Sequence, residues 1–95
     1  MAIKIIIRRK VPKSKEAQLL PLLLELRSKA TTQPGYISGE TLRNLKEPED
    51  YVVISTWKSV DDWKTWEGNK GRLEILSKIE ALLGEKGAYG IYLYG

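Results

Sequence analysis

The chain has 95 residues, a formal net charge of +4 at pH 7, and neither Cys nor His. This length fits one domain, residues 1–95, whose own core is modest. Without Cys and His the chain lacks disulfides, thiolate nucleophiles and the usual metal ligands, and ordinary acid–base catalysis would fall to a perturbed Lys, Glu, Asp or Tyr.

A strand is predicted over residues 3–10, where Ile3, Ile5 and Ile7 form one apolar side and Ile6 makes the other side mixed. The segment carries charge after its apolar run rather than before it, unlike a signal peptide. No run in the chain approaches the roughly 20 apolar residues of a membrane span. We therefore expect a cytoplasmic protein.

Basic residues crowd this strand and its exit: Lys4, Arg8, Arg9, Lys10, Lys13 and Lys15. Such a cluster is able to attract an acidic partner, but charges also commonly protect exposed strand ends. We interpret these residues as solvent-exposed.

A helix is predicted over residues 15–30, after Pro12 ends the strand and with Ser14 as a candidate cap. Pro21 removes one backbone donor, which predicts either a kink or a later helix start. The apolar face of this helix is predicted to contain Leu19, Leu20, Leu23, Leu26 and Ala30.

A turn at residues 33–35 leads into a predicted strand over residues 36–45. Gly39 lies in the middle of this strand and predicts a bulge, or the close approach of another backbone or a ligand. Residues 46–50 predict an exposed hairpin turn.

The apolar, β-branched run at residues 51–57 predicts a buried strand that is covered on both sides. Ser59 is placed to cap the next helix, and Asp62, three residues on, completes a capping box. That helix is predicted to extend to Trp66.

Two glycines within residues 67–71 predict a break in the helical pattern. A further helix is predicted to end at Gly84, and residues 88–94 supply the last strand. The apolar positions of that helix are Leu73, Leu76, Ile79, Leu82 and Leu83.

The predicted order is β, α, β, β, α, β, which indicates an α+β ferredoxin-like sandwich with a four-stranded antiparallel sheet and both helices on one face. Apolar groups on both sides of this sheet would leave the second side in water in a single chain. We therefore predict a homodimer in which the two sheets face each other across a two-fold axis.

Two stretches, QPGYISGETL at residues 33–42 and YVVISTWKSVDDWKTW at residues 51–66, resemble the antibiotic biosynthesis monooxygenase domain. The resemblance extends over nearly the whole chain. It implies a dimeric α/β barrel of this topology. For the oxygenases that give the family its name, it also implies oxidation of polyketide phenols without metal or flavin.

The same family includes haem-degrading enzymes, in which Asn, Trp and His take the positions that Ile7, Trp66 and Leu76 occupy here. Many other members carry His at the position of Trp66 and Ser-Pro-His at residues 69–71. Only Trp66 matches, so the resemblance assigns no haem and no other cofactor to this chain.

Three tryptophans, Trp57, Trp63 and Trp66, are candidates for one aromatic pocket. Trp63 and Trp66 are one helical turn apart, and a cleft lined by them would hold a flat phenol or quinone. Core filling is the more common role of aromatic pairs at this spacing. Trp66 is the strongest pocket candidate.

Four polar residues are further pocket candidates: Arg43, Asn44, Arg72 and Tyr36. The two arginines and the amide are able to stabilise a substrate oxygen or enolate, although solvent exposure is their more usual state. Tyr36 is a candidate hydrogen-bond donor to a phenolate. So are Tyr89, Tyr92 and Tyr94, for which dimer contacts are the alternative role. The sequence identifies no catalytic base.

These features favour a cofactor-independent monooxygenase that acts on a small aromatic phenol or quinol. The alternative is a non-catalytic homodimer that binds a small aromatic ligand or serves as an accessory protein. RNA binding ranks last, because the chain has no Phe and the predicted third strand lacks the aromatic signature of RNA recognition modules.

Overall fold

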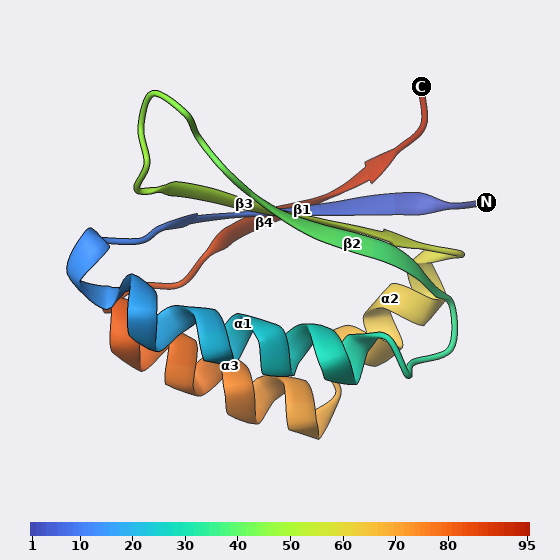
Figure 1. Cartoon of the computed structure of the whole chain (residues 1–95). Helices are drawn as coiled ribbons and strands as arrows, with labels where there is room; N and C mark the ends of the chain where they lie inside the picture. Colours follow the sequence, from blue (N-terminus) through green and yellow to red (C-terminus); the bar gives the residue numbers. More distant parts are fainter.

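The computed structural model describes all residues, 1–95, and places one antiparallel sheet over a layer of helices (Figure 1). The elements in chain order are β1 (Ile3–Lys10), the short 3-10 helix η1 (Lys13–Lys15), α1 (Glu16–Ala30), β2 (Tyr36–Arg43), β3 (Asp50–Trp57), α2 (Val60–Glu67), α3 (Lys70–Leu83) and β4 (Ala88–Leu93). The strand order is β2-β3-β1-β4, and each neighbouring pair is antiparallel. The predicted α+β ferredoxin-like fold is confirmed.

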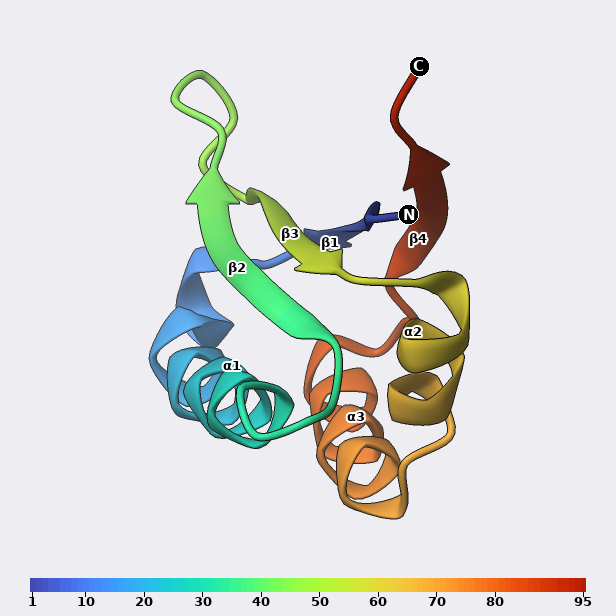
Figure 2. The same cartoon turned by 90° about the vertical axis from the view of Figure 1, so that its right-hand side faces the viewer.

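All three α-helices lie on the same side of the sheet (Figure 2). Strand alternation directs every second side chain of β1 and β3 into this helix layer. The buried hydrophobic residues form two clusters. The first joins the central strands to α2 and the end of α1 and contains Ile3, Ile5, Ile7, Ala30, Trp57, Trp63 and Trp66. The second joins α1 to α3 and contains Val11, Leu19, Tyr51, Ile75 and Ile79.

Local sequence sets the ends of α2 and α3. The Ser59 hydroxyl accepts a hydrogen bond from the Asp62 backbone N–H at 3.1 Å and donates one to the Asp62 carboxylate at 3.0 Å. Asn69 caps α3 in the same way, since its Oδ1 accepts from the Arg72 N–H at 3.1 Å. Gly84 ends α3 with φ 76°, a conformation that favours glycine. The predicted cap, break and stop are confirmed.

Some local predictions are wrong. Ser14 caps neither helix, because the N-cap positions of η1 and α1 are Pro12 and Lys15, and neither position makes a side-chain cap hydrogen bond. α1 continues from Glu16 to Ala30 as one helix through Pro21, so the later start is also wrong. The irregular pairing in β2 falls between Tyr36 and Ser38 rather than at Gly39.

The helix faces differ in part from the predicted ones. Leu20 of α1 is 46% exposed and Leu73 of α3 is 50% exposed, whereas Arg72, Ile75 and Ile79 are buried. The buried row of α3 advances by three and then four residues, which follows one face of a helix, and Leu73 lies outside that row. None of the helices has the length and apolar character needed to cross a bilayer.

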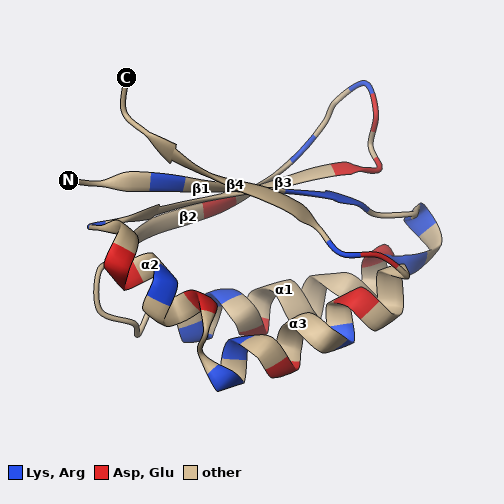
Figure 3. Cartoon of the chain, turned by 180° about the vertical axis from the view of Figure 1, so that it is seen from behind, with Lys and Arg blue, Asp and Glu red and all other residues tan.

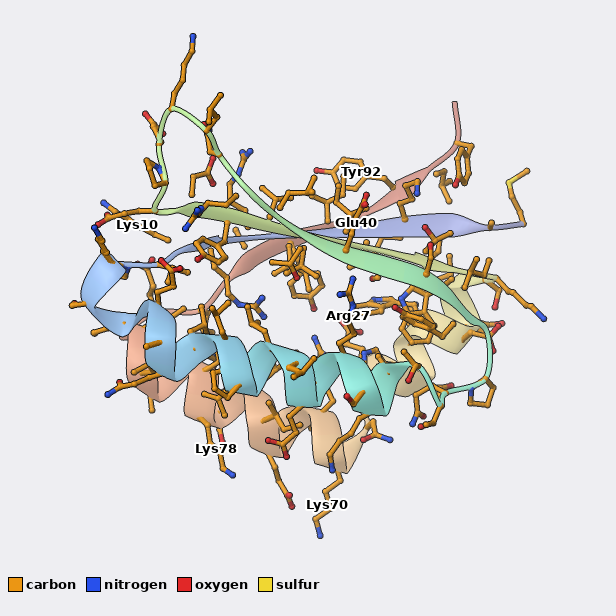
Figure 4. All side chains as sticks on the ribbon, viewed as in Figure 1. Lys10, Arg27, Glu40, Lys70, Lys78 and Tyr92 are labelled. Atoms are coloured by element: carbon orange, nitrogen blue, oxygen red, sulfur yellow. The ribbon has the colours of Figure 1, made fainter.

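The other face of the sheet carries no helix (Figure 1). Ile6, Val52 and Ile54 lie at its centre and are only half-buried. Tyr92 projects from this face, away from the helices (Figure 4).

The charged residues lie mainly on the helices and loops (Figure 3). Within a single chain β3 is therefore covered on one side, and the prediction of cover on both sides is not met.

Candidate functional site

A cleft lies between the sheet and the helix layer. Seventeen residues from β1, β2, β3, α1, α2 and α3 line it. β2 is an edge strand and lies above α1 (Figure 2), and both elements contribute lining residues. Its volume is about 70 Å³, which is room for a few water molecules or part of a small ring.

The indoles of Trp57, Trp63 and Trp66 form one wall of the cleft. The ring centroid of Trp57 lies 5.8 Å from that of Trp63, edge to face, and 6.3 Å from that of Trp66, nearly parallel. All three side chains are almost fully buried. The structure thus brings the three predicted pocket residues together, and it also makes them core residues. Their part in binding a substrate stays a prediction.

Tyr36 extends the aromatic wall along β2. Its ring packs edge to face on Trp57, with centroids 5.3 Å apart. A Cβ atom at Gly39 would lie 2.6 Å from the Tyr36 hydroxyl oxygen, so glycine makes room for that group. The group that approaches Gly39 most closely is thus the Tyr36 side chain, rather than the backbone or ligand that was predicted.

Two of the predicted candidates, Arg43 and Asn44, lie outside the cleft. The Arg43 guanidinium is exposed and pairs with the Glu16 carboxylate at 3.3 Å. The Asn44 side chain accepts from the backbone N–H groups of Lys46 and Glu47 at 2.9 and 3.1 Å. These contacts stabilise the end of β2 and the hairpin turn.

Arg72 does lie in the cleft, in the first turn of α3. Its guanidinium donates to the Glu67 carbonyl oxygen at 2.8 Å and lies 5.2 Å from the Trp63 ring centroid. Burial lowers the pKa of Arg72, and the charges of Tyr89, Glu67 and Glu80 oppose this effect.

Arg9 is a cleft residue that the sequence interpretation placed in solvent. It is 6% exposed and lines the cleft beside Arg72. Burial lowers the pKa of Arg9, the charge of Arg72 lowers it further, and Glu80 raises it. The signal was the strand alternation, because Arg9 continues the buried series that Ile5 and Ile7 begin.

Arg27 was also missed. Its side chain extends from α1 toward the sheet and donates a hydrogen bond to the carbonyl oxygen of Gly39 in β2 (Figure 4). It therefore joins α1 to β2, and both residues line the cleft. With Arg9 and Arg72 it makes the lining strongly cationic, since the one acidic lining residue, Glu40, is paired with Ile54 on the helix-free side of the sheet.

Tyr89 of β4 packs edge to face on Trp63, with centroids 6.0 Å apart. Its hydroxyl donates a hydrogen bond to the Glu67 carboxylate. This hydrogen bond is the main cause that raises the pKa of Tyr89, followed by burial. Tyr89, Tyr92 and Tyr94 are all exposed, and none of the three lines the cleft.

Comparison with known proteins identifies relatives. The family described as antibiotic biosynthesis monooxygenase matches residues 2–78. Protein SchA of Streptomyces halstedii is 23% identical over 65 residues, which are 68% of this chain but only 17% of SchA. A conserved protein from Methanosarcina mazei Go1 has a TM-score of 0.92 at 19% identity, over 100% of this chain and 94% of that one. SnoaB, a cofactor-independent oxygenase from Streptomyces nogalater, has a TM-score of 0.88 at 19% identity, over 99% and 93% of the two chains. At these identities the solved structures support the shared fold.

Proposed function

This chain belongs to the antibiotic biosynthesis monooxygenase family, and from that premise we propose that it is a cofactor-independent monooxygenase acting on a small aromatic phenol or quinol. The observation that carries the proposal is the cleft, in which an indole wall meets cationic side chains. Indole faces suit a flat ring, and cations suit the negative charge that forms on its oxygen. The cofactor-independent neighbour SnoaB, which has the same fold, gives further support.

The proposed reaction begins with ionisation of the substrate hydroxyl. A free phenol has a pKa of about 10, and the positive charges of Arg9, Arg27 and Arg72 lower the pKa of a phenol bound among them. No lining carboxylate points into the cleft to act as a base, so we propose that the proton leaves to water.

The ionised ring then transfers one electron to dioxygen. The resulting radical and superoxide combine to form a carbon–oxygen bond, and the ring hydroperoxide loses water. A hydroquinone plus O₂ thus gives a hydroxyquinone plus H₂O, in which atoms and electrons balance. The chain's part is to orient the ring against the indoles, stabilise the anion and exclude bulk water.

Oxygen uptake with a panel of naphthohydroquinones tests this proposal, with the spontaneous oxidation rate subtracted. Trp66→Ala is expected to abolish enzyme-dependent uptake, because it removes the indole that stacks on Trp57. Trp66 is 4% exposed, so this truncation also costs roughly 3–5 kcal/mol of stability. Trp66→Phe keeps an aromatic face and is the matched variant; it is expected to retain uptake. No uptake by the wild type on any member of the panel would refute the proposal and leave the non-catalytic binding protein.

We also propose that the protein is a homodimer formed through the helix-free face. Ile6, Val52 and Ile54 are half-buried at the centre of that face, and Leu42 and Tyr92 are 47% and 53% exposed. A second copy placed across a two-fold axis buries both patches at once. Mass measurement at low micromolar concentration is the test, and a clean monomer would count against the dimer.

A cytoplasmic location and a single domain over residues 1–95 stay predictions.

A further inference from the structure

Two guanidinium groups line the cleft without an ion-pair partner. Arg9 is 6% exposed and Arg72 is 5% exposed. The ion pairs of this chain are Arg8 with Asp50 and Arg43 with Glu16, so no carboxylate oxygen lies within 4.0 Å of either buried guanidinium. Buried charges are normally paired, because an unpaired one loses its hydration without compensation.

The contacts within the chain leave most donors of these two groups free. Arg72 donates to the Glu67 carbonyl oxygen, while the side chain of Arg9 takes part in none of the side-chain hydrogen bonds. Each guanidinium carries five N–H donors. Glu80 and Glu67 act on the pair only through longer-range attraction.

The fold makes room for this arrangement. A Cβ atom at Gly87 would lie 3.1 Å from Cγ and 3.3 Å from Nε of Arg9, so glycine leaves the passage that the Arg9 side chain occupies. A second cavity of about 40 Å³ lies against the same two arginines, and Tyr89 and Glu80 also line it. The guanidinium groups therefore have open space beside them rather than packed side chains.

We propose that Arg9 and Arg72 form a subsite for an ionised carboxylate on the aromatic substrate. A carboxylate has two oxygens in one plane, which match the planar fork of a guanidinium and accept from both groups at once. A phenolate offers one oxygen for both cations, whereas a carboxylate offers one oxygen to each of them. The three indoles and Tyr36 line the adjoining part of the cleft, where the ring of the same molecule lies.

This inference rests on the proposed function and narrows its substrate class to hydroxylated aromatic acids. Neutral phenols and quinols would bind the same indoles but would carry no carboxylate for Arg9 and Arg72 to pair with. Arg9 of β1 would thus select acidic over neutral substrates, although no sequence motif includes this residue.

Salicylate and salicylamide are the matched probes, because they share one ring and one hydroxyl and differ by the carboxylate. Isothermal titration calorimetry with the full-length protein is expected to give at least about tenfold tighter binding of salicylate, as suits charge-assisted hydrogen bonds. In the wild type, salicylate is also expected to shift the Nε–Hε NMR signals of Arg9 and Arg72, a readout that needs no variant.

Three variants test which residue causes the preference for salicylate over salicylamide. Arg9→Met is expected to reduce it to less than about threefold, because one of the two cations is lost. Arg9→Lys keeps the charge without the fork and is expected to retain an intermediate preference. Arg43→Met removes an exposed arginine outside the cleft and is expected to leave the preference unchanged.

Equal binding of the two probes, absence of salicylate binding, or a full preference in Arg9→Met would each overturn the subsite. Tighter binding of phenyl phosphate than of salicylate would overturn its assignment to a carboxylate. Oxygen uptake separates this inference from the proposed function. Turnover of neutral naphthohydroquinones without a salicylate preference refutes the subsite alone, and a salicylate preference without turnover of any hydroquinone refutes the oxygenase alone.

Discussion

Replacement of Arg9 by Met is expected to stabilise the folded protein. Arg9 is 6% exposed and has no ion-pair partner, and its neighbour Arg72 carries the same charge. Met has a similar length, so it fills the same passage beside Gly87 without a charge to desolvate. Replacing a buried ion pair by apolar residues of similar volume is often neutral or stabilising by about 1–4 kcal/mol, and Arg9 lacks even the attraction of a partner.

We expect a gain of about 2 kcal/mol, in the middle of that range, because Glu80 offsets part of the cost of the buried charge. For a domain of this size such a gain raises the melting temperature by roughly 10 °C. Activity is expected to fall in Arg9→Met, because the wild type retains this charge for function at a cost in stability.

Urea unfolding followed by tryptophan fluorescence measures this gain, because all three indoles are buried in the folded chain. Wild type and variants are compared at one protein concentration, since dimerisation would link stability to concentration. Arg43→Met is the control. It breaks an exposed ion pair and is expected to change stability by less than about 1 kcal/mol.

A loss of stability above about 1 kcal/mol in Arg9→Met would refute this reasoning. It would mean that the guanidinium of Arg9 already has a good partner in the folded protein. An anion would then have no unpaired cation to bind at Arg9.

Two further changes test the surroundings of the cleft. Ser59→Ala removes the cap of α2 and is expected to lower the free energy of unfolding by about 1 kcal/mol in the same urea experiment; an unchanged midpoint would contradict the role of the cap. Glu67→Gln is expected to lower the pKa of Tyr89 toward its ordinary value, because the carboxylate that accepts the Tyr89 hydrogen bond is the main cause of the raised pKa. An NMR titration of the Tyr89 Cζ carbon measures this, and an unshifted curve would contradict it. A raised pKa means that folding holds the phenol proton more tightly. The stabilisation is thus fully present below the ordinary tyrosine pKa of about 10, and it is lost as the pH rises through the pKa of the folded state.

The elements and their order could be predicted from the sequence because local patterns specify them. The alternation of Ile3, Ile5 and Ile7 defined β1, and Ser59 and Gly84 marked helix ends by their own hydrogen bonding and backbone preference. The aromatic wall was also accessible, since a strand that ends at Trp57 and a helix that follows at once keep their side chains close.

The cationic part of the site depended on tertiary structure. Arg27, Arg72 and Arg9 come from three separate elements, and only the packing of α1 and α3 against the sheet brings them to one cleft. A charged side chain usually lies in solvent, so a prediction based on charge alone placed Arg9 at the surface. Arg43, by contrast, lies at the surface, where it forms an ion pair with Glu16.

The sequence by itself determined the family, the strand and helix order, and the apolar character of both sides of the sheet, because these depend on residues near one another along the chain. Only the tertiary structure decided which face of α3 is buried and which arginines lose their water. The physical reason is that the rotation of a helix and the burial of a charge depend on the neighbours supplied by other elements.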